Sequence, residues 1–411
     1  MNKRIILRMG LDKKILSNFL KIHRKFSASP KYKIVNMIKC GLNVIKYDRL
    51  VKHESSYILN SFVPPLNSPA FLNIAMNVPG EGADFFENHI RGKRLAPISA
   101  YIAATGKCQY HCWHCSAKSS INNKELNTES LLTIVAKLQN LGVGIIGFTG
   151  GEPLLRPDLE QIISSIDPQQ SIPLVFSTGF NLSLERATAL KTAGLFGIAI
   201  SLDSINKEKH DKMRGYPGAY DQALKAIRNA KKAGLYTMSQ TVCTRELMAN
   251  GEILELARML QSEGIQEMRI IEPLPCGQLA ASHSALLSLD EQNDLKNLHI
   301  LLNSTKQYPK ASVFPYFESA EQFGCGAGSQ HSYVDALGNY GPCDFLDLRY
   351  GNLLTDDIQE VWQKMHKASG VPKCFCLAKS TGLHPASHNA VSENAKLPKF
   401  YQLLGGGSLE L

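Results

Sequence analysis

The sequence lacks the two features that would carry it into or across a membrane. None of its 411 residues belongs to an apolar run long enough to span a bilayer. The N-terminus is basic but has no clean apolar stretch ahead of a cleavage site, as a secretory signal would have. Ten cysteines without an export signal favour a reducing compartment, where thiols serve metals or chemistry. We therefore expect a cytoplasmic protein.

Acidic residues are nearly absent from the N-terminal segment, residues 1–53. It holds 14 Lys and Arg residues against Asp12 and Asp48, so its formal charge is +12, while the other 358 residues sum to −3. Two apolar stripes recur at helical spacing: Leu11, Ile15, Phe19, Ile22 and Phe26, then Ile34, Val35, Ile38, Leu42 and Ile45.

Basic amphipathic helices of this kind have three interpretations, and all stay open. They bind an anionic membrane surface or an acidic peptide, which would make the protein peripheral to the membrane. They can also pack their apolar faces on the main domain, or form an organelle transit peptide. Aromatic residues interleaved with basic ones are sparse here, so a nucleic-acid partner is not expected.

From about residue 97, apolar strand-like runs alternate with amphipathic helical stretches. Short continuous apolar runs are typical of buried parallel strands. The expected strands are 98–104, 143–148, 173–176, 197–202, 236–242 and 268–271, and the expected helices are 128–140, 157–166, 184–193, 219–233 and 247–262. This alternation predicts an α/β fold with a parallel sheet curled as a partial (β/α)6 TIM-like barrel, whose functional residues lie at the C-terminal strand ends.

Three cysteines follow the first expected strand. Cys108, Cys112 and Cys115 have the spacing C-x3-C-x2-C. Three thiolates can hold three irons of a four-iron cluster and leave the fourth iron an open position for a substrate. Zinc is the alternative, with His111 or His114 as its fourth ligand.

Small and polar residues follow the next three strands, and together they are expected to ring one site. They are Gly150, Gly151 and Glu152 after the second strand, Ser177 and Asn181 after the third, and Ser201 and Asp203 at the end of the fourth. A glycine pair exposes backbone groups to a ligand, and a carboxylate can accept a strong hydrogen bond from a ligand ammonium.

The cysteine triplet after the first strand and the Gly-Gly-Glu-Pro turn after the second resemble the radical S-adenosylmethionine (SAM) enzymes, over roughly residues 97–305. The resemblance implies a [4Fe-4S] cluster that chelates SAM at its open iron. It further implies that one electron, from a flavodoxin- or ferredoxin-type donor, cleaves SAM to methionine and a 5′-deoxyadenosyl radical. That radical abstracts hydrogen from a C–H bond of the substrate.

The same resemblance implies a role for each site residue. The roles are cluster ligands for Cys108, Cys112 and Cys115, SAM amino-group contacts for Gly150, Gly151 and Glu152, ribose contacts for Ser177 and Asn181, and the polar end of strand four for Ser201 and Asp203. His114 occupies the position whose backbone meets the adenine. Arg214, in the stretch 210–215, is implied to reach the SAM carboxylate, with a surface ion pair as the alternative.

Four more cysteines lie within 52 residues near the C-terminus: Cys325, Cys343, Cys374 and Cys376. They favour a second cluster ligated by cysteine over a structural zinc. The C-x12-G-x4-C arrangement resembles the SPASM or Twitch auxiliary-cluster domain, which implies at most one auxiliary [4Fe-4S] cluster here. The chain closes with C-x-C where the short form has C-x2-C, and if one of these thiols does not bind, the cluster has an open site.

Four segments are expected: a basic amphipathic N-terminal extension (1–95), a radical SAM core (96–305), a small β-hairpin/α auxiliary-cluster domain (306–395) and a flexible tail (396–411). Cys276 lies just past the sixth strand, where it can face the cavity. It is the candidate for a further catalytic residue.

The expected function is that of a radical SAM enzyme, an oxidoreductase or transferase, modifying a ribosomal peptide or a small molecule, with the auxiliary cluster handling the second electron. A membrane-surface enzyme acting on a lipid or isoprenoid is the first alternative, because residues 1–53 lack the strand-first pattern of a leader-peptide-binding domain. A non-catalytic iron–sulfur electron-transfer protein is the second, although the Gly-Gly-Glu-Pro turn argues against it.

Overall fold

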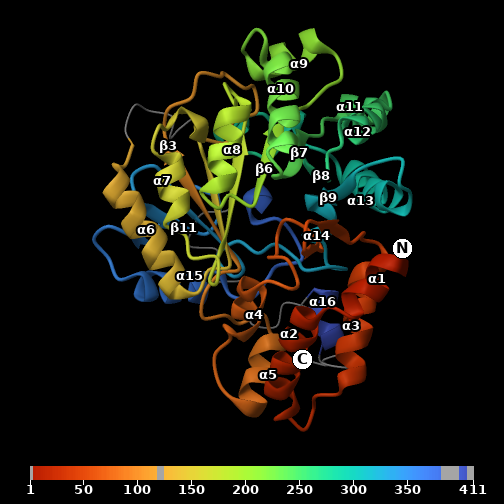
Figure 1. The fold of residues 1–411 in the computed structure, drawn as a ribbon, viewed down its shortest axis with the longest axis vertical. Coiled ribbons are helices and arrows are strands. Elements are labelled where there is room, and N and C mark those ends of the chain that lie inside the picture. The colour runs from red at the N-terminus through yellow and green to blue at the C-terminus, as the bar shows by residue number, and fades with distance from the viewer. Residues whose placement is uncertain (1–2, 118–124, 381–397, 405–411) are drawn as a thin grey trace.

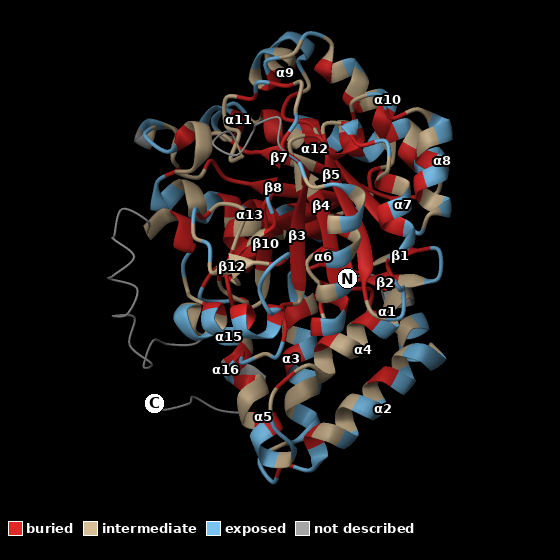
Figure 2. Cartoon of the chain, turned by 90° about the vertical axis from the view of Figure 1, so that its left-hand side faces the viewer, coloured by how far each residue is buried: buried red, intermediate tan, exposed pale blue. Residues whose placement is uncertain are grey.

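The structure is a computed structural model that describes residues 3–117, 125–380 and 398–404. A ten-stranded sheet forms its centre, in the order β12-β11-β10-β3-β4-β5-β6-β7-β8-β9, and its interior strands are buried (Figures 1 and 2). The strands are β3 (Ser99–Thr105), β4 (Ile145–Gly150), β5 (Ile172–Ser177), β6 (Gly197–Ser201), β7 (Tyr236–Val242), β8 (Glu267–Ile271), β9 (Lys310–Val313), β10 (His331–Val334), β11 (Asn339–Gly341) and β12 (Gly351–Asn352). A separate hairpin pairs β1 (Val51–His53) with β2 (Ser56–Ile58).

Helices connect the strands and cover the sheet (Figure 1). They are α1 (Lys3–Gly10), α2 (Lys13–Ser27), α3 (Ile34–Lys46), α4 (Pro69–Met76), α5 (Gly82–Ile90), α6 (Thr128–Leu141), α7 (Leu159–Ser164), α8 (Leu184–Thr192), α9 (Lys207–Arg214), α10 (Ala219–Lys232), α11 (Arg245–Ala249), α12 (Glu252–Glu263), α13 (Leu289–Ser304), α14 (Phe314–Phe317), α15 (Ile358–Ser369) and α16 (Lys399–Leu404). No helix among the described residues is both long and apolar enough to cross a membrane.

Helix α6 illustrates how the sequence builds these layers. The Asn127 side chain accepts a hydrogen bond from the Ser130 N–H and so begins the helix. Leu131, Ile134, Val135 and Leu138 fall on one face and are buried against the sheet. Gly142, at a φ of 108°, ends the helix and turns the chain into β4.

The sequence prediction of a parallel α/β sheet, open as a partial barrel, is confirmed. All six expected strands are present as β3 to β8, and each pairs in parallel with its neighbour along the chain. Two further parallel strands extend the sheet: β9 beside β8 and β10 beside β3. Both come from the stretch expected to form the auxiliary-cluster domain, so one sheet joins that stretch to the core. The hairpin of β10 and β11 lies at the edge next to β3.

The N-terminal helices carry apolar residues on more than one face, and only one of these faces is buried. Phe26 of α2 is buried against Phe85 and Phe86 of α5, with ring centroids 5.5 and 6.0 Å away. The other sides remain exposed, at Leu7, Leu11, Leu16 and Leu20 on and near α1 and α2, and at Ile34, Val35, Ile38 and Leu42 on α3. Nine of the seventeen exposed large apolar side chains in the described chain lie within residues 1–53.

Segments near both ends of the described chain are anchored to the rest of the molecule. Buried Asp48 forms an ion pair with buried Lys310 of β9, and Arg49 donates to the carbonyl of Tyr308 at 2.7 Å. Within the expected flexible tail, the described residues 399–404 form α16, which packs on α3 and α5. The rest of that tail, and residues 381–395 of the expected auxiliary domain, lie outside the described residues.

Candidate active site and second cysteine site

The loop of the cysteine triplet leaves the C-terminal end of β3 and is held by the turn after β4. The Gly151 N–H donates to the Thr105 carbonyl and the Glu152 N–H to the Lys107 carbonyl, both at 2.8 Å. A Cβ on Gly151 would lie 1.9 Å from the Lys107 carbonyl oxygen. Only glycine at position 151 therefore allows the turn after β4 to pack this closely against the cysteine loop.

Two other segments hold the rest of the loop. At the end of α9, the Arg214 carbonyl accepts a hydrogen bond from the His111 N–H at 3.1 Å. The Met213 carbonyl accepts one from the Trp113 N–H at 3.2 Å. On the other side, the Gln278 N–H donates to the Cys115 carbonyl at 3.0 Å. The three cysteines are thus fixed by segments that follow β4, β6 and β8.

A cavity of about 160 Å³ lies at this end of the sheet. The sequence-predicted residues that line it are Cys108, Cys112, Cys115, Gly150, Gly151, Ser177, Ser201, Arg214 and Cys276. Glu152, Asn181 and Asp203 are not among its lining residues. The structure therefore gathers the ends of β3 to β8 around one pocket, as the strand-end rule requires.

Glu152 lies beneath the pocket and braces two strand ends. Its fully buried carboxylate accepts hydrogen bonds from Ser177 Oγ at 2.7 Å and from the Thr178 N–H and Oγ1 at 2.7 and 2.6 Å. Burial raises its pKa, and these hydrogen bonds oppose the rise. Its assignment to the SAM amino group stays a prediction.

Arg214 and Asp203 form a buried ion pair at 2.6 Å, and Arg214 Nη1 lies 3.9 Å from Cys112 Sγ. Burial alone would raise the pKa of Asp203, but the positive charge of Arg214, helped by the histidines 114 and 210, lowers it below its ordinary value. Asp203 thus keeps a guanidinium beside a cysteine of the triplet.

Asn181 lies away from the pocket. It is exposed and holds a φ of 51° in the turn that leads to α8. Asparagine is one of the few residues that adopt this left-handed conformation readily, so the turn alone accounts for it. Its expected ribose contact stays a prediction.

Three polar atoms at this pocket have no hydrogen-bond partner within the described chain: His114 Nδ1, Arg214 Nε and Glu272 Oε2. Burial lowers the pKa of His114 to about 4, with the Arg214 charge acting in the same direction, so its imidazole is neutral at pH 7. Buried polar groups are normally paired, so these atoms favour a polar ligand. A cation, a carboxylate and a neutral imidazole suit the charged and hydroxyl groups of SAM.

Cys276 also lines this pocket, beside the cysteine triplet. Burial raises the pKa of its thiol to about 12, so it is protonated at neutral pH. The geometry places it where a substrate can reach it, and its catalytic role stays a prediction.

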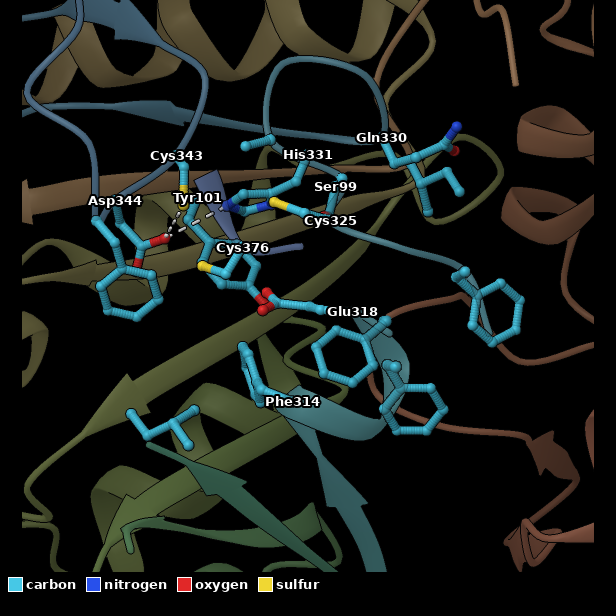
Figure 3. A pocket seen from close by; sticks show the side chains of 18 of the residues that line it. Ser99, Tyr101, Phe314, Glu318, Cys325, Gln330, His331, Cys343, Asp344 and Cys376 are labelled. Atoms are coloured by element: carbon cyan, nitrogen blue, oxygen red, sulfur yellow. Dashed lines mark hydrogen bonds and ion pairs between the residues drawn. The ribbon is translucent and has the colours of Figure 1, made fainter. Parts of the chain in front are cut away.

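A second, largely apolar cavity of about 190 Å³ adjoins the first, and both are lined by Thr149, Phe176 and Asp344 (Figure 3). Cys325, Cys343 and Cys376 line it, and they pack together. A hydrogen bond from Cys376 lowers the pKa of Cys325 to about 6, against the effect of burial. Cys374 is not among the residues that line this cavity.

Sequence reasoning missed four acidic or histidine side chains here. Glu272 directly follows β8, so the strand-end rule could have found it. Glu318, His331 and Asp344 carry no such signal, because they lie in the short segments around α14 and β10.

The comparisons with known proteins agree with this geometry. Residues 102–262 match the sequence profile of the Radical SAM superfamily. An AdoMet-dependent heme synthase of Oleidesulfovibrio alaskensis is 24% identical over 66% of this chain and 76% of its own. The mycofactocin maturase MftC of Mycobacterium tuberculosis is 28% identical over 65% of this chain and 71% of its own. The structure of Streptococcus suis SuiB bound to precursor peptide SuiA shares the fold, with a TM-score of 0.54 and 14% identity over 67% of this chain and 66% of that one.

Proposed function

We propose that this chain, a radical SAM enzyme through its domain at residues 102–262, abstracts hydrogen from an apolar part of a substrate bound between its two cysteine groups. When bound, the [4Fe-4S] cluster supplies the electron that cleaves SAM, and the 5′-deoxyadenosyl radical so formed takes the hydrogen. In the proposal, Cys108, Cys112 and Cys115 hold that cluster. An auxiliary cluster at the second cysteine group exchanges the second electron.

The chain's own residues fit a bound SAM molecule. Arg214, although paired with Asp203, has an unpartnered Nε for the SAM carboxylate, and Glu272, although paired with Lys379, has an unpartnered Oε2 for a hydrogen-bond donor of SAM. Glu152 fixes Ser177 and Thr178 at the pocket wall through its hydrogen bonds. The proposal also includes a flavodoxin- or ferredoxin-type donor, because the cleavage consumes an electron that no side chain here supplies.

The observation that carries the proposal is the apolar cavity beside the SAM pocket. Phe62, Phe314, Phe317 and Phe323 form part of its wall, and Arg269 lies over the Phe314 ring at 5.2 Å. An apolar wall excludes water from a reactive radical and favours an apolar substrate group. The wall ends at Thr149 and Phe176, which also line the SAM pocket.

The first test is SAM cleavage by the full chain, reconstituted with iron and sulfide and reduced with dithionite. We expect 5′-deoxyadenosine from the wild type and none from Cys112→Ala. Phe314→Gln, which changes only the second cavity, should keep substrate-free cleavage within about twofold. An intact cluster that cleaves no SAM would overturn the proposed function.

A peptide is the first candidate substrate. MftC is a maturase and SuiB has been seen with a precursor peptide, as their names state. An apolar side chain of a peptide would fit the aromatic wall. A peptide enzyme would not need the exposed apolar residues of α1 to α3.

A lipid or isoprenoid is the second candidate, and those exposed residues favour it. Leu16, Leu20, Ile38 and Leu42 are exposed on a segment of formal charge +12. Apolar side chains among Lys and Arg residues bind anionic membrane surfaces. Contact with a membrane through residues 1–53 would bring an amphiphilic substrate to the enzyme.

Vesicle flotation separates the two candidates. Deleting residues 1–53 would also remove buried Asp48 from Lys310, so four surface substitutions are the sharper variant. We expect wild type to float with phosphatidylglycerol vesicles, and Leu16→Ser, Leu20→Ser, Ile38→Ser and Leu42→Ser combined to lose at least about tenfold in binding. Leu289→Ser, at a still more exposed site elsewhere, is the control. Wild type that does not float would count against a lipid or isoprenoid substrate.

A further inference from the structure

The second cysteine group includes an acidic side chain. Glu318, Cys325 and Cys376 each offer one ligand atom, and these atoms all lie within 4.8 Å of one another. Cys343 lines the same cavity and packs in the same cluster. Figure 3 shows all four side chains pointing into one space, although they come from separate segments of the chain.

Glu318 lies in a setting that suits a metal ligand. It is partly buried, and none of the ion pairs among the described residues involves it. The nearby Lys379 is paired with Glu272 instead. A carboxylate held among thiols without a cation is costly, and a metal ion would offset that cost.

Cys374 is separated from this group. Cys325 pairs with Lys373 in a β-bridge, with the Cys325 N–H donating to the Lys373 carbonyl at 2.7 Å. The chain bends at residues 374 and 375, directly after this bridge. Cys376 then lines the cavity beside Cys325, whereas Cys374 is not among the residues that line it.

His331 is the rival ligand, and its contacts weaken its case. It forms a second group with Cys343 and Asp344. However, its Nδ1 lies 2.8 Å from Ser99 Oγ and its Nε2 lies 3.5 Å from Asp344 Oδ1. Both ring nitrogens already have partners, whereas the Glu318 side chain has a hydrogen bond with Cys376 and no ion pair among the described residues.

We propose that Cys325, Cys343 and Cys376 hold the auxiliary centre with the Glu318 carboxylate as its fourth ligand, and that Cys374 is not a ligand. The inference rests on the auxiliary centre of the proposed function. It replaces the four-cysteine set expected from the sequence by three thiolates and one oxygen. A carboxylate is a harder ligand than a thiolate, so the four irons would not be equivalent.

The test uses the full chain with Cys108, Cys112 and Cys115 changed to Ala, so that only the auxiliary centre is measured. After anaerobic reconstitution, iron and sulfide are counted, and Mössbauer and electron paramagnetic resonance spectra are recorded. Cys374→Ala should keep the full content, about four irons per chain. Glu318→Gln should lose the distinct iron site or convert to a three-iron signal on oxidation. Glu321→Gln, an exposed neighbour, is the matched control.

Two results would overturn the assignment. One is loss of the cluster in Cys374→Ala, and the other is a Glu318→Gln spectrum identical to that of Glu321→Gln. Zinc without sulfide in the background variant would instead overturn the iron–sulfur centre of the proposed function. The two failures are therefore distinguishable, and neither depends on SAM cleavage.

Discussion

Asp203 holds Arg214 in place, at 2.6 Å, in a pair that is almost wholly buried. The pair lies behind the cysteine triplet, with the guanidinium 3.9 Å from Cys112 Sγ. Asp203 also accepts the Val242 N–H at 2.9 Å, so one carboxylate ties β6, β7 and α9 together. The positive charge that faces the SAM pocket is therefore positioned by a residue outside that pocket.

Changing Asp203 to Asn should strongly destabilise the protein. Arg214 would be left as a buried charge without its partner, which costs about 3–5 kcal/mol. The surface pair of Lys207 and Asp221 has the same 2.6 Å separation but is exposed to solvent, so Asp221→Asn should cost far less stability. Urea denaturation measures the free energy of unfolding of both variants. An equal loss of stability in the two would contradict the role assigned to Asp203.

Adding a methyl group at Gly151 should prevent the triplet from binding iron. The new Cβ of Gly151→Ala would overlap the Lys107 carbonyl, so the loop must move. We expect the SAM-binding cluster to be lost while the auxiliary iron remains. Iron and sulfide analysis measures this. Gly41→Ala on α3, where a Cβ meets nothing within 4 Å, should retain full iron content.

Glu152→Gln should weaken both stability and SAM binding. An amide nitrogen would replace one of two oxygens that accept from Ser177 and Thr178, and each buried donor left unpaired costs about 1–3 kcal/mol. Thermal unfolding and equilibrium dialysis with SAM measure the two effects. Glu185→Gln, at an exposed site, serves as the control. An unchanged melting temperature and SAM affinity in Glu152→Gln would show that the hydrogen bonds to Ser177 and Thr178 are dispensable.

Mild acid should loosen the N-terminal helices. Burial, with the Arg94 charge in second place, lowers the pKa of His89 to about 3. The folded state keeps the ring neutral, but the unfolded state binds a proton below a pH of about 6.5. Stability is therefore full above that pH and falls as the pH drops toward 3.

Hydrogen exchange of α2 and α5 at pH 7 and pH 5 measures this effect. His89 packs on Phe26 at 4.9 Å between ring centroids, so the non-titrating His89→Leu keeps an apolar contact. After correction for the slower intrinsic exchange at pH 5, we expect lower protection factors at pH 5 than at pH 7 in wild type and a smaller change in the variant. The same pH dependence in both proteins would exclude His89 as the cause.

Strands β3 to β6 were predictable from the sequence because most of their residues are buried, which produces runs of apolar and small residues. Strand β9 was missed because it begins with Lys310, whose charge hides a position that is buried with Asp48. A hairpin was expected within residues 306–395, where β10 and β11 form one, but the parallel pairing of β10 with β3 was not predicted, because His331 and Ser332 break the apolar pattern of a buried strand.

The residues of the candidate site also fall into those that could be predicted from the sequence and those that could not. Residues at the ends of strands were predictable, because the ends of parallel strands meet at one edge. The position of Cys374 was not, because sequence spacing does not tell which side of the β-bridge at Lys373 its thiol takes. On α3 the predicted apolar stripe is largely the exposed face, at Ile34, Val35, Ile38 and Leu42. On α2 the exposed Leu16 and Leu20 lie outside the predicted stripe, because apolar residues occur on both sides of that helix.

The parallel pairing of β10 with β3 has a consequence for the growing polypeptide. Ser99 and His331 face each other across this pair but are 232 positions apart in the chain. A nascent chain therefore leaves the ribosome with one side of β3 unpaired until the last quarter of the protein has been made. Because Cys325 and Cys343 flank β10, the step that closes this side of the sheet also brings in cysteines of the second site. The second cysteine site is therefore completed only after the strands that carry the first cysteine site have been made.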